Sequence, residues 1–221
     1  IIDTWTPISN SFSGFLIRVD FPSANIGYIS GTGGVVLKTT NGGDTWTALS
    51  SGTTQDLYVV NFISDDIGFV GGNGNTLLKT LDGGQTWTPL PTTNVRGIYF
   101  FDANNGFISG GAGYLSKTSD GGQTWNILNS GTTNGLHTIY FINNNVGFVC
   151  GQYGYLIKTI DSGNNWSVIN TGISFAGNSL LIDVNFINQN IGYCVGGNFE
   201  GTESYILKST NGGNTWNRLS P

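Results

Sequence analysis

The most constraining feature of this chain is a tryptophan motif that recurs about every 41 residues. The spacings are 41, 41, 38, 41 and 50 residues, between Trp5, Trp46, Trp87, Trp125, Trp166 and Trp216. A phenylalanine precedes the next tryptophan by 25 residues in four repeats and by 30 in the fifth, at Phe21, Phe62, Phe100, Phe141 and Phe186. Self-similarity at a fixed period of this length indicates a repeat architecture, in which each unit buries its apolar face against its neighbours.

Each repeat is predicted to contain four short β-strands, which we name a to d in chain order. In the first repeat they are LIRVDF, IGYISG, VVLKTT and TWTALS. Runs of five or six β-formers separated by Gly, Asn and Asp are strand–turn–strand signals. The composition agrees, because two glutamates and five lysines are too few for long helices, whereas glycine is abundant, with 35 residues. Four-stranded units at this period are typical of β-propeller blades.

We therefore predict an all-β chain with one domain over residues 1–221, a five-bladed β-propeller of four-stranded antiparallel blades. Its repeats end near Trp46, Trp87, Trp125, Trp166 and Trp216. Strand d occurs six times, whereas strands a to c occur five times, because Trp5 has the regular 16-residue distance to Phe21. We predict that the N-terminal DTWTPIS strand closes the ring at the fifth blade, as its fourth strand or outside the Trp216 strand. Such closure removes an exposed sheet edge.

The segment KTTNGGDTWT and its four relatives lie between strands c and d, so we predict that they form hairpin turns. One side chain in each turn can accept hydrogen bonds from the following backbone N–H groups, at Asn41, Asp82, Asp120, Asp161 and Asn211. A calcium site is the alternative, but two of these five positions are Asn, and no turn has a second acidic ligand beyond Asp44. We expect scaffolding turns, with no metal and no cofactor.

These turns carry a resemblance to a known family. The pattern Ser/Thr-x-Asp-x-Gly-x-x-Trp resembles the Asp-box, or bacterial neuraminidase repeat, and KTLDGGQTW and KTSDGGQTW are its clearest copies. The fuller form G-x-x-G-x-L-x-K-T-x-D-G-G-x-T-W resembles propellers of the photosystem II assembly factor-like family. Five copies cover nearly the whole chain. The resemblance implies a β-propeller whose boxes lie away from the active face. It leaves the activity open, since such boxes occur in sialidases, other glycosidases, sortilin-like receptors and many secreted proteins.

The charge distribution disfavours a nucleic-acid partner. The net charge is −5, and phosphate binding depends on clusters of Lys and Arg. All five lysines occupy one position of the repeat, which leaves Arg18, Arg96 and Arg218. The photosystem relatives present an arginine-rich patch that this chain lacks, so a photosystem-type assembly factor is the lowest-ranked of our three hypotheses.

We expect no enzymatic activity. Sialidases that resemble this repeat hold their substrate with three arginines, but Arg218 falls in the last, outermost strand. A carbohydrate-active enzyme is the alternative. Glycosidases need two carboxylates about 5–10 Å apart, and four carboxylates in or near loops are candidates, namely Asp56, Asp183, Glu200 and Glu203. Exposed loop carboxylates are more often solvated. His137 is the only histidine, and no Ser-His-Asp or Cys-His arrangement accompanies it.

A binding site is expected on the face that carries the d–a and b–c loops. The fifth repeat has insertions in both loops, through NTGISFAGNSLLID and GGNFEGTESY, and the third repeat is shortened at PTTNVRG. Insertions beside a notch can give a symmetric ring one asymmetric site, although neutral loop drift would produce the same pattern. The predicted ligand-binding residues are Tyr58, Arg96, His137, Tyr153, Phe175, Asp183, Phe199, Glu200 and Glu203.

The resulting hypothesis is a non-catalytic secreted or cell-surface binding module for a glycan or protein ligand, as one domain of a longer exported protein. The chain has no methionine and its apolar runs are too short to span a bilayer, so we expect an extracellular, cell-surface or periplasmic location. Cys150 and Cys194 lie one position out of step in corresponding strands. Two buried free thiols are therefore favoured over a disulfide.

Overall fold

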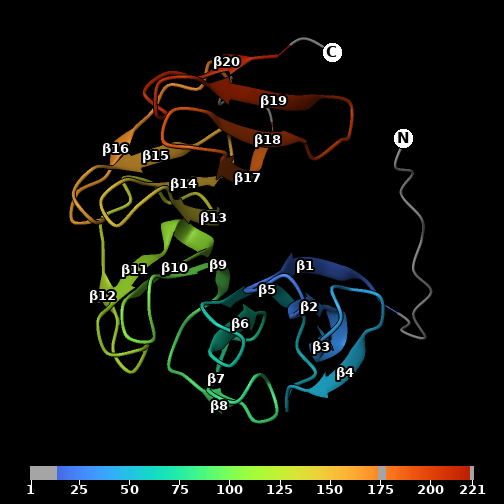
Figure 1. Cartoon of the computed structure of the whole chain (residues 1–221). Coiled ribbons are helices and arrows are strands. Elements are labelled where there is room, and N and C mark those ends of the chain that lie inside the picture. The colour runs from blue at the N-terminus through green and yellow to red at the C-terminus, as the bar shows by residue number, and fades with distance from the viewer. Residues whose placement is uncertain (1–13, 174–177, 220–221) are drawn as a thin grey trace.

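The computed structural model describes residues 14–173 and 178–219, which form five antiparallel sheets of four strands each (Figure 1). Blade 1 consists of β1 (Leu16–Asp20), β2 (Gly27–Gly31), β3 (Val35–Thr39) and β4 (Thr47–Ser50). Blade 2 consists of β5 (Leu57–Phe62), β6 (Gly68–Gly72), β7 (Thr76–Thr80) and β8 (Thr88–Pro89). Blade 3 consists of β9 (Val95–Phe100), β10 (Gly106–Gly110), β11 (Leu115–Thr118) and β12 (Asn126–Ile127). Blade 4 consists of β13 (Leu136–Phe141), β14 (Gly147–Gly151), β15 (Leu156–Thr159) and β16 (Ser167–Val168). Blade 5 consists of β17 (Ser179–Phe186), β18 (Gly192–Asn198), β19 (Ser204–Ser209) and β20 (Asn217–Arg218).

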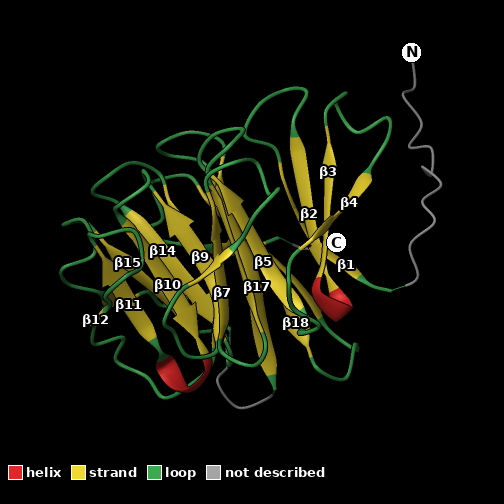
Figure 2. Cartoon of the chain, turned by 90° about the horizontal axis from the view of Figure 1, so that it is seen from below, coloured by secondary structure: helices red, strands yellow, loops and turns green. Residues whose placement is uncertain are grey.

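The prediction of a five-bladed β-propeller is confirmed. Each sheet runs in the chain order a-b-c-d, from the centre of the ring outward (Figure 1). Figure 2 shows the loops gathered at the two ends of the strands. Strands d of blades 2 to 5 are only two residues long and exposed, and short edge strands limit pairing with other chains. In blade 5, β20 is the fourth strand. The predicted closing strand DTWTPIS lies outside the described residues.

The recurring Gly–aromatic pair has a packing reason. Gly106 precedes Phe107 in β10, and a Cβ atom at residue 106 would lie 2.5 Å from the Phe100 ring of β9. Only glycine therefore lets the ring of strand a lie flat on strand b. The same close approach recurs in every blade, at Gly27, Gly68, Gly106, Gly147 and Gly192.

The turns between strands c and d are held by a hydrogen-bond network that repeats in all five blades. In blade 3 the Thr118 hydroxyl donates to Asp120 Oδ1 at 2.8 Å and accepts from the Gly122 backbone at 2.9 Å. Asp120 in turn accepts from the backbone and the hydroxyl of Thr124. These donors lower the pKa of Asp120 to about 2, with the Thr124 hydroxyl as the largest cause. In blade 1, Asn41 Oδ1 accepts from the Thr39 hydroxyl and the Thr45 backbone, and its Nδ2 donates to the Thr45 hydroxyl. The predicted hairpin turns, in which this side chain accepts hydrogen bonds from backbone N–H groups, are therefore confirmed.

The two cysteines are buried free thiols that face each other across the interface between blades 4 and 5. Their side chains point to opposite faces of their own sheets, and for that reason they meet between neighbouring blades. Both belong to one apolar cluster. Hydrogen bonding to Cys194, followed by burial, raises the pKa of the Cys150 thiol. Among the described residues, no helix is long and apolar enough to cross a membrane.

Candidate functional site

A cavity of about 380 Å³ lies at the centre of the ring. It is lined by Arg18 and by one residue from the innermost strand of each blade, namely Ile17, Tyr58, Arg96, His137 and Ile182. Each of these five residues lies four positions before the repeat phenylalanine, so they are equivalents in the repeat. Five equivalent positions with four different residue types therefore surround one space, so the side chains that line the cavity do not follow the pseudosymmetry of the ring.

The backbone explains why these five side chains reach the cavity. The register between strands a and b shifts in every blade at this position, as between Leu57 and Val59 in blade 2. In each blade the residue skipped by the register is the one that lines the cavity. Such a β-bulge leaves one residue unpaired and re-aims its side chain. We name these five residues the bulge ring: Ile17, Tyr58, Arg96, His137 and Ile182.

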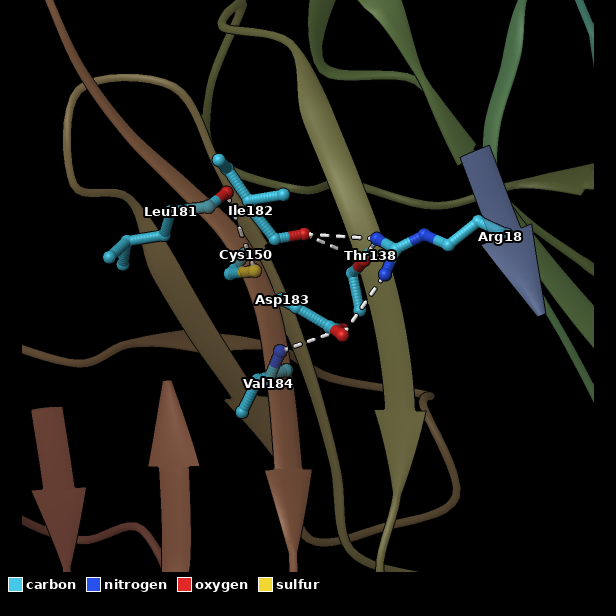
Figure 3. Close-up of polar contacts among 7 residues, drawn as sticks. All are labelled: Arg18, Thr138, Cys150, Leu181, Ile182, Asp183 and Val184. Carbon is cyan, nitrogen blue, oxygen red and sulfur yellow. Dashed lines mark hydrogen bonds and ion pairs between the residues drawn. The ribbon is translucent and has the colours of Figure 1, made fainter. Parts of the chain in front are cut away.

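Arg18 joins the first and last blades beside this cavity (Figure 3). Its guanidinium donates to Asp183 Oδ2 at 3.0 Å and to the Thr138 hydroxyl at 3.0 Å. A longer bond of 3.3 Å reaches the Ile182 carbonyl, which also accepts from the Thr138 hydroxyl. A smaller neighbouring cavity of about 150 Å³ is lined by this group of side chains. The charge of Arg18 is thus matched by Asp183.

Arg96 has no such match. Arg18–Asp183 is the one ion pair among the described residues, and Arg96 Nε is buried without a hydrogen-bond partner there. His137 Nε2 is also buried without a hydrogen-bond partner among the described residues. Burial, followed by the charges of Arg96 and Arg18, lowers the pKa of His137 to about 4. At neutral pH the cavity therefore contains an unmatched guanidinium, a neutral imidazole and a phenol, which together can bind an acidic group.

The structure brings together only part of the predicted site. Tyr58, Arg96 and His137 line the cavity, and Asp183 lies beside it, bonded to Arg18. Tyr153 lies in the β14–β15 loop with a positive φ of 58° and does not line the cavity. Phe175 is outside the described residues.

The remaining predicted residues belong to the β18–β19 loop of blade 5. Phe199 and Glu200 are exposed there. Glu203 accepts a hydrogen bond of 2.5 Å from the Tyr205 hydroxyl. None of these three residues lines the cavity. The loop that carries both glutamates is thus separate from the bulge ring.

Sequence reasoning missed Ile17, Arg18, Thr138 and Ile182 as site residues. The available signal was the repeat alignment, because counting back four residues from each repeat phenylalanine reaches every member of the bulge ring. The predicted position of Arg218 is correct, since it lies in the outermost strand β20, with its guanidinium 4.6 Å from the centre of the Tyr205 ring.

Comparison with protein families and solved structures agrees with this architecture. The family model for photosynthesis system II assembly factor YCF48 matches residues 2–95 and 89–179. The structure of YCF48 bound to D1 peptide is 18% identical, with a TM-score of 0.53, over 96% of this chain and 82% of that chain. YCF48 from Cyanidioschyzon merolae is 17% identical, with a TM-score of 0.54, over 98% of this chain and 88% of that chain.

A propeller enzyme superimposes better on part of its length. An ancestral GH74 enzyme is 18% identical, with a TM-score of 0.77, over 99% of this chain but only 33% of the enzyme. This chain therefore spans a third of that enzyme, and at such identity the likeness shows the fold alone. A search of curated proteins found no match.

Proposed function

Because the chain belongs to the photosynthesis system II assembly factor YCF48 family, we propose that it is a non-catalytic binding module that holds an acidic segment of a polypeptide at its central cavity. A relative in this family binds a peptide, which supports a polypeptide as the class of ligand. The observation that carries the proposal is Arg96, a cation in the cavity whose Nε atom has no partner in the described chain.

The chemistry of the cavity suits a carboxylate ligand. A guanidinium binds a carboxylate by two parallel hydrogen bonds, which fixes the orientation of the ligand as well as its charge. The neutral imidazole of His137 supplies one further donor or acceptor, and Tyr58 supplies an aromatic surface with a hydroxyl. Ile17 and Ile182 provide apolar contact on the other side of the ring.

A non-catalytic role is supported by the placement of the carboxylates. None of the described residues that line the cavity is Asp or Glu, and the nearby Asp183 is bonded to Arg18. Glycoside hydrolysis needs two carboxyl groups on either side of the scissile bond. The glutamates of the β18–β19 loop do not lie at this cavity, so they do not form such a pair with Asp183 there. A secreted or cell-surface location is part of the proposal and stays a prediction.

The test is a synthetic peptide array on which acidic, neutral and basic peptides of one length are compared, followed by titration of the best peptide. We expect acidic peptides to bind, and Arg96→Gln to weaken binding about 10-fold to 100-fold, because a hydrogen bond to a charged group contributes about 1.5–3 kcal/mol. Arg218→Gln is the matched control, since it removes an arginine outside the cavity. Equal loss in both variants, or binding to a glycan array with no acidic peptide bound, would contradict the proposal.

A further inference from the structure

Consecutive blades are joined by the same aromatic contact four times. The aromatic residue of strand b in one blade stacks on the repeat phenylalanine of the next blade. Tyr28 lies 3.4 Å from Phe62 between ring centres, and the planes are 1° apart. The other three pairs are Phe69–Phe100, Phe107–Phe141 and Phe148–Phe186. Blades 2, 3 and 4 therefore each stack one ring on the following blade and receive one ring from the preceding blade.

Polar contacts repeat across the same four interfaces. The lysine of strand c donates to a backbone carbonyl of the next blade, as Lys38 does to Gly83 at 3.0 Å. The other three are Lys79 to Ala103, Lys117 to Ser162 and Lys158 to Gly212. The side chain of the residue before each repeat phenylalanine also makes a hydrogen bond to the backbone of the repeat phenylalanine in the following blade. These residues are Asp20, Asn61, Tyr99 and Tyr140.

In blade 5, the residues that correspond to those contacting the following blade have no blade to contact. Within the described chain, Lys208 makes no hydrogen bond, and its ammonium lies over the Tyr193 ring at 5.6 Å. Tyr193 stacks on no other ring there, and Asn185 is exposed. Val195 and Ile206 are 42% and 49% exposed. Their equivalents in blade 4, Cys150 and Leu156, are fully buried.

In blade 1, the residues that correspond to those covered by the preceding blade are also exposed. Phe21 is 43% exposed, whereas the repeat phenylalanines of the other four blades are at most 6% exposed. Val19 is 58% exposed, and its equivalent Val60 is buried. The apolar positions that fill every other interface are thus open on both ends of the arc.

The two open faces border one gap. Figure 1 shows blades 1 to 5 following one another side by side, whereas the outer strands of blade 5 and blade 1 lie apart. At the inner end Arg18 still reaches Asp183 at 3.0 Å. The gap is therefore narrow at the centre of the ring and wide outside. Strand a of a blade in this gap would lie between β17 and β1, so it would displace the Arg18–Asp183 ion pair.

We propose that the faces of blades 5 and 1 form a docking site for one further four-stranded blade of the same repeat. Its strand a would place a phenylalanine on Tyr193 and a backbone carbonyl at Lys208. Its strands b and c would place an aromatic ring on Phe21 and apolar side chains on Val19. The added blade would make, with blades 5 and 1, the same contacts that consecutive blades of this chain already make at four interfaces.

The test adds such a blade to the chain. Residues 52–91, the second repeat, are appended after Pro221, which keeps the 16-residue interval between Trp216 and the next repeat phenylalanine. Blade 2 is chosen because it receives Tyr28 and Lys38 from blade 1, the residue types that blade 5 offers as Tyr193 and Lys208. We expect one cooperative unfolding transition at a higher melting temperature, with slowed amide exchange in the appended residues. Lys208→Ala should lower the melting temperature of the extended chain only.

The unextended chain provides the control. There, Lys117→Ala and Leu156→Ser should lower the melting temperature, whereas Lys208→Ala and Ile206→Ser should leave it nearly unchanged, because their interface is unfilled. An appended repeat with unprotected amides would overturn the proposal. So would equal destabilisation by Ile206→Ser and Leu156→Ser in the unextended chain, since the face of blade 5 would then already be covered. Sedimentation analysis of that chain would show whether a second copy covers it.

Discussion

Arg18 and Asp183 are separated by 165 positions in the sequence and by 3.0 Å in space. One belongs to the innermost strand of blade 1 and the other to that of blade 5 (Figure 3). They occupy the same position of the repeat, three residues before the repeat phenylalanine. The repeat thus brings two equivalent positions together at the centre of the ring, and the sequence fills them with opposite charges.

The ion pair should contribute little to stability, because both partners are partly exposed, at 29% and 40%. We expect a double-mutant cycle of Arg18→Met and Asp183→Asn, followed by urea unfolding, to give a coupling free energy of about 0.2–1 kcal/mol. The coupling should fall in 1 M salt, where the Debye length is about 3 Å. A coupling well above this range and insensitive to salt would indicate that the pair joins the blades more strongly than its exposure suggests.

Much of the fold follows from the sequence because the repeat residues perform the same task in each blade. Trp125 and Phe100 make an edge-to-face contact within blade 3, and Phe62 with Trp87 makes the same contact in blade 2. A residue whose environment recurs five times leaves a period in the sequence. Strand number, strand order and turn type could therefore be predicted.

The candidate site follows from the sequence only in part. Members of the bulge ring need only reach the cavity, so their types differ, from Ile17 to Arg96 to His137, and leave no period of their own. The bulge that turns them inward is a backbone feature without a residue signature here. The insertions of blade 5 drew the prediction to Glu200 and Glu203, because length variation is visible in a sequence and side-chain direction is not.

The Asp-box turn predicts a contrast between two substitutions at one position. Asp120→Ala should lower the melting temperature, because Thr124 and Thr118 lose their acceptor. Asp120→Asn should keep most of the stability, since Asn41 and Asn211 accept the same backbone bond in blades 1 and 5 and donate to the threonine hydroxyl instead of accepting from it. Thermal unfolding at pH 7 would compare the two variants. Neither substitution should alter peptide affinity, and a loss of binding with unchanged stability would contradict the scaffolding role.

Gly106 predicts a packing penalty. Gly106→Ala places a Cβ atom 2.5 Å from the Phe100 ring, so the ring must move against its neighbours. Overpacking of this kind destabilises by about 1–3 kcal/mol. Urea unfolding of the variant measures the effect. The double variant with Phe100→Leu should show less than the sum of the two single effects, because the smaller side chain leaves room for the new methyl group. Strict additivity would exclude this contact as the cause.

The buried thiols predict slow chemical reactivity. The thiolate is the nucleophile in reactions with aromatic disulfide reagents, and hydrogen bonding and burial raise the pKa of Cys150. Both Cys150 and Cys194 are fully buried. We therefore expect neither thiol to react in the native protein at pH 8 on the time scale of minutes, and two thiols to react after denaturation. Rapid labelling of one thiol in the native state would show that the interface between blades 4 and 5 opens.

His137 predicts a change of stability in a defined pH range. Its pKa is lowered to about 4 in the folded protein, from 6.5, so the unfolded state takes up a proton first as the pH falls. The contribution of the neutral imidazole to stability is therefore complete above about pH 6.5 and is lost as the pH decreases towards 4. We expect His137→Asn to flatten the curve of melting temperature against pH between 6.5 and 4, while leaving the loss below pH 4 intact. That lower range belongs to carboxylates such as Asp82, whose pKa is lowered to about 2. An unchanged curve in the variant would mean that folding does not shift the pKa of His137, and that the imidazole becomes protonated in the cavity below about pH 6.5.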